Sequence, residues 1–183
     1  VFAPSSDIQI QWQLRTTRDK LLERALDAVR HARSLTGDVQ FSAMDATRAD
    51  RGFLMELYCA ARDAGASMLN ISDTTGYIMP AEVKSLVSLL SEKVKRPGIS
   101  LSIHCHNDLG LATANTIAAV EAGIDQIEVT LCGIGERASN ASMQELIRSL
   151  PYLSGGTVYE TDIIPEAFAA AEECLWRIIS EPC

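Results

Sequence analysis

The stretch that decides the fold is Leu101-Ser102-Ile103-His104-Cys105-His106-Asn107-Asp108-Leu109-Gly110. Apolar and polar residues alternate in its first six positions, which is typical of a β-strand. Because residues i and i+2 of a strand project from the same face, His104 and His106 are predicted to lie together, with Cys105 on the opposite face. Two imidazoles at a strand end suit a divalent metal. A pair of solvated histidines is the alternative, because two ligands do not make a metal site.

Strands with a similar alternation are predicted elsewhere in the chain. Four strands begin near residues 39, 67, 100 and 126, so the unit repeats every 26 to 33 residues. A short strand is also predicted within residues 1–6, followed by an irregular polar stretch to Arg15. Apolar residues at helical spacing predict helices over about 17–35, 51–64, 80–95, 111–122, 141–150 and 165–179. Alternating strands and helices indicate parallel strands, since a helix-containing crossover joins parallel neighbours.

One face of each predicted strand is mostly polar and the other is apolar. The polar faces are Gln40/Ser42/Met44, Asn70/Ser72/Thr74, Ser102/His104/His106 and Glu128/Thr130/Cys132. An open doubly wound sheet buries both faces and reads as nearly continuous apolar strands, so a barrel with a polar interior fits better. Residues at the C-terminal ends of barrel strands carry the chemistry, and the two histidines lie at such an end. We therefore predict an α/β fold of the (β/α)8 TIM-barrel type.

The predicted strands are too few for a complete barrel. A typical barrel needs about 250 residues, whereas this chain has 183 and begins at Val1 without an initiator Met. We expect an incomplete barrel of about five strands, strands 4–8 of the full set, plus a C-terminal helix. Residues 1–153 are expected to be the C-terminal part of a catalytic barrel domain, and residues 154–183 a post-barrel linker helix.

Composition excludes several classes of partner. The net charge is −8 and no Lys/Arg cluster occurs, so we expect neither nucleic acid nor a membrane surface as a partner. No run of roughly 18 apolar residues is present, which predicts no transmembrane helix. The five cysteines are scattered without a CxxC pair, which favours neither a disulfide framework nor a zinc knuckle. A reduced, cytoplasmic setting is the expectation.

Four motifs occur in order along the chain: FSAMDATR (41–48), DTTGY (73–77), HCHNDLGLA (104–112) and GIGERASN (133–140). Together they resemble the 2-isopropylmalate synthase family, whose relatives include homocitrate and citramalate synthases and, more distantly, 3-hydroxy-3-methylglutaryl-CoA lyase. The resemblance covers about residues 1–150. The GxGERxxN form of the last motif favours the synthases over the lyase.

The resemblance implies a TIM barrel that binds one divalent metal, usually Mg²⁺, Mn²⁺ or Zn²⁺, and that forms a homodimer. The metal chelates a 2-oxo acid through its carboxylate and keto oxygens. A base removes a proton from the methyl group of acetyl-CoA, the carbanion attacks the keto carbon, and water then cleaves the thioester. A leucine-biosynthetic acyltransferase of this kind is the leading expectation. A lyase that cleaves the corresponding C–C bond, and a non-catalytic half-barrel that pairs with another subunit, are the alternatives.

The family's functional residues map onto four positions of this sequence. By resemblance, His104 and His106 match the two imidazole ligands and Asn140 matches the side-chain oxygen at the metal. Thr74 matches the threonine that hydrogen-bonds the carboxylate of the 2-oxo acid. From the residues alone, the preferred interpretation of Asn140 is an N-cap of the helix at 141–150, and Thr74 is alternatively only a turn residue at a strand end. No catalytic base is assigned.

Two departures from the family pattern bear on the chemistry. Met44 stands where many of these synthases carry a glutamate, and a thioether neither accepts a proton nor pairs with a cation. The family's remaining metal ligand is an aspartate on the first barrel strand, beside an arginine that contacts the 2-oxo acid. That part of the barrel has no counterpart in this sequence, so we expect residues 1–183 alone to bind metal poorly unless a second chain completes the barrel.

Overall fold

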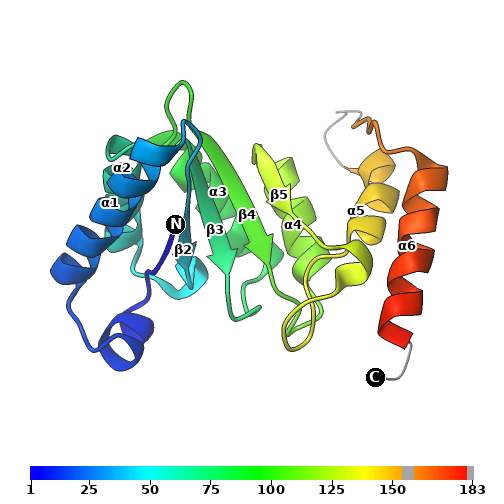
Figure 1. Cartoon of the computed structure of the whole chain (residues 1–183), viewed down its shortest axis with the longest axis horizontal. Helices are drawn as coiled ribbons and strands as arrows, with labels where there is room; N and C mark the ends of the chain where they lie inside the picture. The colour runs from blue at the N-terminus through cyan, green and yellow to red at the C-terminus, as the bar shows by residue number, and fades with distance from the viewer. Residues whose placement is uncertain (154–158, 181–183) are drawn as a thin grey trace.

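Five parallel strands form one sheet in chain order, with helices around its outside (Figure 1). The computed structural model describes residues 1–153 and 159–180. The strands are β1 (Phe2–Pro4), β2 (Gln40–Met44), β3 (Met68–Asp73), β4 (Ser100–Cys105) and β5 (Gln126–Glu128). The α-helices are α1 (Arg18–Leu35), α2 (Arg51–Asp63), α3 (Pro80–Lys93), α4 (Ala112–Glu121), α5 (Met143–Ser149) and α6 (Pro165–Ser180). The predicted α/β organisation is confirmed, with element ends displaced by a few residues.

The sheet is strongly curved, as a barrel wall must be. In a flat sheet β2 and β5 would lie about 14 Å apart, three strand spacings. Instead, Gln40 Nε2 on β2 donates a hydrogen bond to Glu128 Oε1 on β5 at 2.8 Å. The described strands are therefore a segment of a barrel whose polar faces turn inward, as their alternation predicts.

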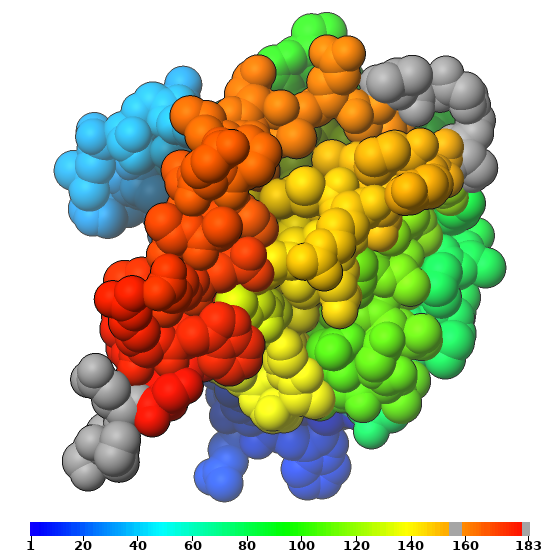
Figure 2. Space-filling view, turned by 90° about the vertical axis from the view of Figure 1, so that its right-hand side faces the viewer, coloured from blue at the N-terminus to red at the C-terminus, as the bar shows by residue number. Residues whose placement is uncertain are grey.

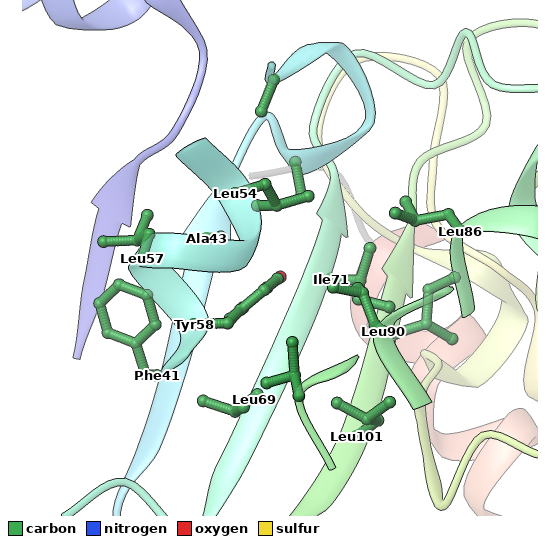
Figure 3. Packing of buried hydrophobic residues seen from close by; sticks show 14 of the residues in the cluster. Phe41, Ala43, Leu54, Leu57, Tyr58, Leu69, Ile71, Leu86, Leu90 and Leu101 are labelled. Atoms are coloured by element: carbon green, nitrogen blue, oxygen red, sulfur yellow. The ribbon is translucent and has the colours of Figure 1, made fainter. Parts of the chain in front are cut away.

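The apolar faces of the strands pack outward against the helices (Figure 3). Phe41 of β2 meets Tyr58 of α2 edge to face, with ring centroids 6.4 Å apart. The buried Tyr58 hydroxyl donates to the Asn70 carbonyl at 2.7 Å, which ties α2 to β3. Leu101, Ile103 and Cys105 of β4 are fully or almost fully buried on this side. Their packing fixes the direction in which the intervening His104 must point.

Helix starts follow local capping chemistry. The Thr17 hydroxyl accepts from the Lys20 N–H at the start of α1, and the Asp50 carboxylate accepts from Phe53 N–H at the start of α2. In α3, Pro80 occupies the first turn, where its missing N–H costs no helical hydrogen bond. These caps determine where each helix leaves the sheet, and hence where the preceding loop lies.

Three local expectations are wrong. The N-cap of α5 is Ser142, whose hydroxyl accepts from Glu145 N–H, so Asn140 does not cap this helix. The strand that begins near residue 126 was expected to carry Glu128, Thr130 and Cys132 on one face, but it ends at Glu128. Cys132 adopts a left-handed φ of 57°, and Leu131–Gly133 form a 3-10 turn. The stretch expected to be irregular contains a π-helical turn, Gln9–Gln13, which buries Ile10.

Helix α6 lies beside α5 on one flank of the molecule (Figures 1 and 2). Gln144 Nε2 of α5 donates to Glu172 Oε1 of α6 at 2.7 Å. The domain boundary predicted after residue 153 falls on residues 154–158, outside the described residues. Within the described segments, no helix combines the length and apolar character needed to cross a membrane.

Candidate metal and substrate site

A pocket of about 510 Å³ opens at the carboxyl ends of the strands. Its lining includes Met44 from β2, Thr74 after β3, His104 from β4, His106 directly after it, and Glu128 from β5. Asn140 completes it from the loop before α5. All four residues assigned by resemblance thus border one cavity. In barrels of this type, that end of the strands carries the chemistry.

The two histidines are neighbours with their Nδ1 atoms engaged. Their ring centroids are 4.8 Å apart. His106 Nδ1 lies 3.2 Å from the Asp73 carbonyl oxygen, and His104 Nδ1 lies 2.9 Å from Glu128 Oε2. A carbonyl only accepts, so His106 carries its proton on Nδ1 and leaves Nε2 unprotonated. Burial lowers the pKa of His106, which keeps the ring neutral at pH 7, the form that binds metals.

Asn140 is brought to the histidines by the backbone. It forms an isolated antiparallel bridge with His106, and the flanking Asn107 N–H donates to the Ser139 carbonyl at 2.9 Å. Its Nδ2 donates to the Ile134 carbonyl, while its buried Oδ1 has no hydrogen-bond partner within the described part of the chain. A Cβ at Gly135 would lie 2.7 Å from Asn140 Cγ, so glycine there leaves room for this side chain.

These groups fit part of a metal site. Two imidazole nitrogens and an orphaned amide oxygen are donors that Zn²⁺, Mn²⁺ and related ions accept. Across residues 1–153 and 159–180, no cluster of three or more His, Cys, Asp or Glu side chains suited to a metal is present. Three donors leave coordination positions for oxygens from a substrate or from a further ligand.

The Thr74 hydroxyl is held in place by a hydrogen bond that it accepts. Its Oγ1 receives the N–H of Asp45 at 2.8 Å, which leaves the hydroxyl proton free to donate. Asp45 itself is buried with φ of 60°, and Arg48 binds its carboxylate through two hydrogen bonds of 2.8 and 2.7 Å. Thr74 therefore presents on the pocket wall a hydroxyl that accepts one hydrogen bond and has its proton free to donate.

A family model described as HMGL-like matches residues 1–170. The chain belongs to the HMGL-like family.

Relatives of this HMGL-like chain are named as 2-isopropylmalate synthases. 2-Isopropylmalate synthase 1 of Caldanaerobacter subterraneus subsp. tengcongensis is 46% identical over 151 residues, which are 82% of this chain and 38% of that protein. The 2-isopropylmalate synthase of Pyrococcus furiosus is 47% identical over 150 residues, 81% of this chain and 30% of that protein. The chain thus spans 30–38% of the length of these two relatives.

Solved structures confirm the barrel fold of this HMGL-like chain. Hydroxymethylglutaryl-CoA lyase from Pseudomonas aeruginosa superposes with a TM-score of 0.82 at 19% identity, over all of this chain and 63% of that chain. The carboxyl transferase domain of Rhizobium etli pyruvate carboxylase, solved with pyruvate, gives 0.61 at 20% identity, over 78% of this chain and 24% of that chain. At these identities the likeness concerns the fold alone.

Three loops of the HMGL-like chain are joined at the rim by Arg137, which follows β5. Its guanidinium binds the Asp108 carboxylate of the loop after β4 with two hydrogen bonds of 2.8 Å, and it donates to the Thr74 carbonyl after β3 at 2.8 Å. The Arg137 guanidinium lowers the pKa of Asp108. A Cβ on Gly76 would come within 2.6 Å of Asp108 Oδ2, so glycine is needed for this close approach. Sequence reasoning did not pair Arg137 with Asp108.

Glu128 is a second residue that sequence reasoning missed. The alternation of the sequence predicts only that Glu128 lies on a polar strand face, and it indicates no partner for the carboxylate. The structure gives it three, because Gln40 and Asn70 donate to its Oε1 and His104 lies at its Oε2. Burial raises the pKa of Glu128, but these hydrogen bonds outweigh burial and hold the pKa below its ordinary value. The sequence carries no signal for this contact, because it depends on the strand register that pairs His104 with Glu128.

Met44 gives one end of the pocket an apolar character. It lines the pocket together with Phe2, and it also borders an apolar groove of about 330 Å³ beside β1. Among the described residues, no lysine or arginine lines the pocket that holds the histidines. A substrate with a second carboxylate would find no cationic partner on this wall.

Proposed function

We propose that this chain is part of the catalytic barrel of a metal-dependent acyltransferase that condenses acetyl-CoA with a 2-oxo acid. One observation carries the proposal. His104, His106 and the unpartnered Oδ1 of Asn140 border a single pocket at the carboxyl ends of barrel strands. The names of the relatives, 2-isopropylmalate synthases at 46–47% identity, support this reaction class.

The residues have separate roles in the proposal. His104, His106 and Asn140 hold a divalent ion, which when bound acts as a Lewis acid on the keto group of the 2-oxo acid. Thr74 donates its free hydroxyl proton to the substrate carboxylate and so fixes the orientation of the keto carbon. Arg137 holds the loops that carry Thr74 and Asn140 in register. No group of the described chain is assigned as the base.

The pocket wall favours a 2-oxo acid with an apolar side chain. Met44 and Phe2 offer dispersion contacts but no charge, which suits a branched aliphatic group such as that of 2-oxoisovalerate. 2-Oxoglutarate would place its second carboxylate against this wall without a cationic partner, which is unfavourable for a charge taken out of water. A homodimeric state and a cytoplasmic location are carried forward as proposals from the resemblance and from the dispersed, free cysteines.

A thiol-release assay tests the proposal. The chain is incubated with acetyl-CoA, Mn²⁺ or Mg²⁺, and pyruvate, 2-oxoisovalerate or 2-oxoglutarate in turn. We expect CoA release that requires both the metal and a 2-oxo acid, is fastest with 2-oxoisovalerate, and disappears in His104→Ala. Such release would also indicate that a second chain completes the barrel, most simply by oligomerisation. Release that persists in EDTA, or that is unchanged in His104→Ala, would contradict the proposal. A chain that neither binds these metals by calorimetry nor releases CoA would also refute it for residues 1–183.

A further inference from the structure

The Glu128 carboxylate is held between two sets of partners across the barrel interior. Its Oε2 faces His104 Nδ1 at 2.9 Å. Its Oε1 receives Gln40 Nε2 at 2.8 Å and also Asn70 Nδ2. Neither oxygen is left without a protein partner, which argues against Glu128 as a direct ligand and in favour of a role exerted through His104.

The two amides that face Oε1 are oriented by their other bonds. Because an ionised carboxylate only accepts, the Asn70 amide nitrogen faces Glu128, and Asn70 Oδ1 then accepts from the Ser72 hydroxyl at 3.0 Å. Gln40 Oε1 accepts from Gln126 Nε2 at 3.4 Å, so the Gln40 amide nitrogen also faces Glu128. The Oε1 side of Glu128 therefore meets only donors, and the polarity of the network is fixed.

We propose that Glu128 is a positioning residue that holds His104 as the Nδ1–H tautomer and turns its bare Nε2 into the pocket. This inference rests on the proposed metal function, for which Nε2 must be unprotonated. A carboxylate that accepts from the second nitrogen of a metal-binding histidine fixes its tautomer and ring orientation. The backbone carbonyl of Asp73 accepts from Nδ1 of His106 and fixes its tautomer in the same way, and no side-chain substitution removes that carbonyl. His106 is therefore an internal reference.

The fixed polarity makes Glu128→Gln a sharp test. The amide oxygen of the new residue should settle at the Oε1 position, because Gln40 and Asn70 both donate there. Its NH₂ group would then face His104 Nδ1 and donate to it. His104 would have to carry its proton on Nε2, where a metal can no longer bind. The substitution keeps the size of the side chain, so the effect is one of proton position and not of packing.

The first readout is the tautomer itself. The chain has three histidines, so long-range ¹H–¹⁵N spectra at pH 8 can be assigned with single His→Ala variants. In the metal-free chain we expect His104 to be the Nδ1–H tautomer, and to become the Nε2–H tautomer in Glu128→Gln while His106 does not change. Glu56→Gln, on the exposed side of α2, is the control for the lost charge. A wild-type His104 with its proton on Nε2, or a tautomer unaltered in Glu128→Gln, would overturn the inference.

The second readout is Mn²⁺ affinity measured by calorimetry. Loss of a partner of this kind costs about 10- to 100-fold in metal affinity, and we expect Glu128→Gln to show a loss in that range. Equal affinity in wild type and Glu128→Gln would overturn the inference. Failure of the wild type to bind Mn²⁺ would instead refute the proposed function, and the tautomer measurement separates the two cases.

A second substitution tests whether the donors at the Oε1 position cause the change of the His104 tautomer. Adding Asn70→Asp to Glu128→Gln places an acceptor opposite the Oε1 position. The NH₂ group of the introduced amide can then donate to that acceptor with its oxygen toward His104 Nδ1, while Gln40 Nε2 still donates at the same position and limits the recovery. We expect the double variant to recover part of the lost Mn²⁺ affinity and to return His104 to the Nδ1–H tautomer. A double variant that binds Mn²⁺ no better than Glu128→Gln and keeps the Nε2–H tautomer would contradict this cause.

Discussion

At the scale of single residues, Thr74 shows how an accepted hydrogen bond determines what a hydroxyl can donate. Because Oγ1 already receives the Asp45 N–H, its proton points elsewhere, and the pocket is where a carboxylate would meet it. A hydrogen bond to a charged group contributes about 1.5–3 kcal/mol. We therefore predict that Thr74→Val lowers kcat/KM for the 2-oxo acid by about 10- to 100-fold. Thr74→Ser, which keeps the hydroxyl, should stay close to wild type. A loss in Thr74→Ser, with Thr74→Val close to wild type, would show that the methyl group matters and the hydroxyl does not.

Asp73 gives a prediction for the dependence of stability on pH. It is buried, Thr47 donates to its Oδ1 at 3.0 Å, and its Oδ2 lacks a partner in the described part of the chain. Burial raises the pKa of Asp73 to about 6, above the ordinary value of 3.8. The folded state then binds a proton that the unfolded state has lost, so the contribution of Asp73 to stability is greatest below pH 4, falls as pH rises through 6, and levels off above that.

Urea unfolding in EDTA buffer measures this effect. Between pH 5 and pH 7.5, Asp73 should remove about 1.4 kcal/mol from the free energy of unfolding, and Asp73→Asn should lack that loss. Asp27→Asn, an exposed position on α1, should keep the wild-type dependence. Identical pH profiles for wild type and Asp73→Asn would contradict the assignment.

Residue-level prediction from sequence succeeded where it depended on periodicity and failed where it depended on register. The i, i+2 rule places His104 and His106 on one face, and the structure confirms it. The same rule puts Glu128 on a polar face but contains no information on which strand it meets. Its bond to His104 requires the alignment of β5 on β4, which only the folded sheet supplies.

At the scale of elements, the rim of the pocket depends on the Arg137 bridge between the loops after β3, β4 and β5. A lysine cannot reproduce the two-pronged bond to Asp108. We predict that Arg137→Lys speeds amide hydrogen exchange several-fold in residues 133–140 and weakens metal affinity. The free energy of unfolding should change by less than about 1 kcal/mol, because the pair is partly exposed.

Arg30→Lys is the matched control, since Arg30 forms an exposed ion pair with Asp27 on α1. It should leave exchange in residues 133–140 unaltered. Unchanged exchange in Arg137→Lys as well would show that the backbone bonds of the loop suffice without the guanidinium.

Sequence patterns located the helices and strands well because capping and periodicity are local. Sequence patterns cannot distinguish Asn140 from Ser142 as the N-cap of α5, since both residue types favour that position. The choice is made by a distant contact: Asn140 bridges to His106, and Ser142 is left to cap. The π-helical turn at Gln9–Gln13 was not predicted from the sequence either. It buries a single residue, Ile10, so the stretch has no apolar periodicity that would predict a helix.

At the scale of the whole molecule, inward polar faces distinguish a barrel segment from an open sheet. The sequence predicted this from alternation, and the bond between Gln40 and Glu128 across the interior confirms the curvature. The interior network has a functional consequence, because the groups that close the curve also orient a histidine of the pocket. The same side chains therefore stabilise the curved sheet and shape the site, so we expect substitutions in the sheet interior to alter the orientation of His104 in the pocket.

The central claim is that His104 and His106 gather a divalent ion to which a 2-oxo acid binds. The most direct test is a calorimetric titration of 2-oxoisovalerate into the chain in Mn²⁺ and, separately, in EDTA. We predict binding in Mn²⁺ only, lost in His104→Ala and in His106→Ala, and kept in His31→Ala, whose histidine is exposed on α1. Equal binding in EDTA, or binding that survives His104→Ala, would contradict the account.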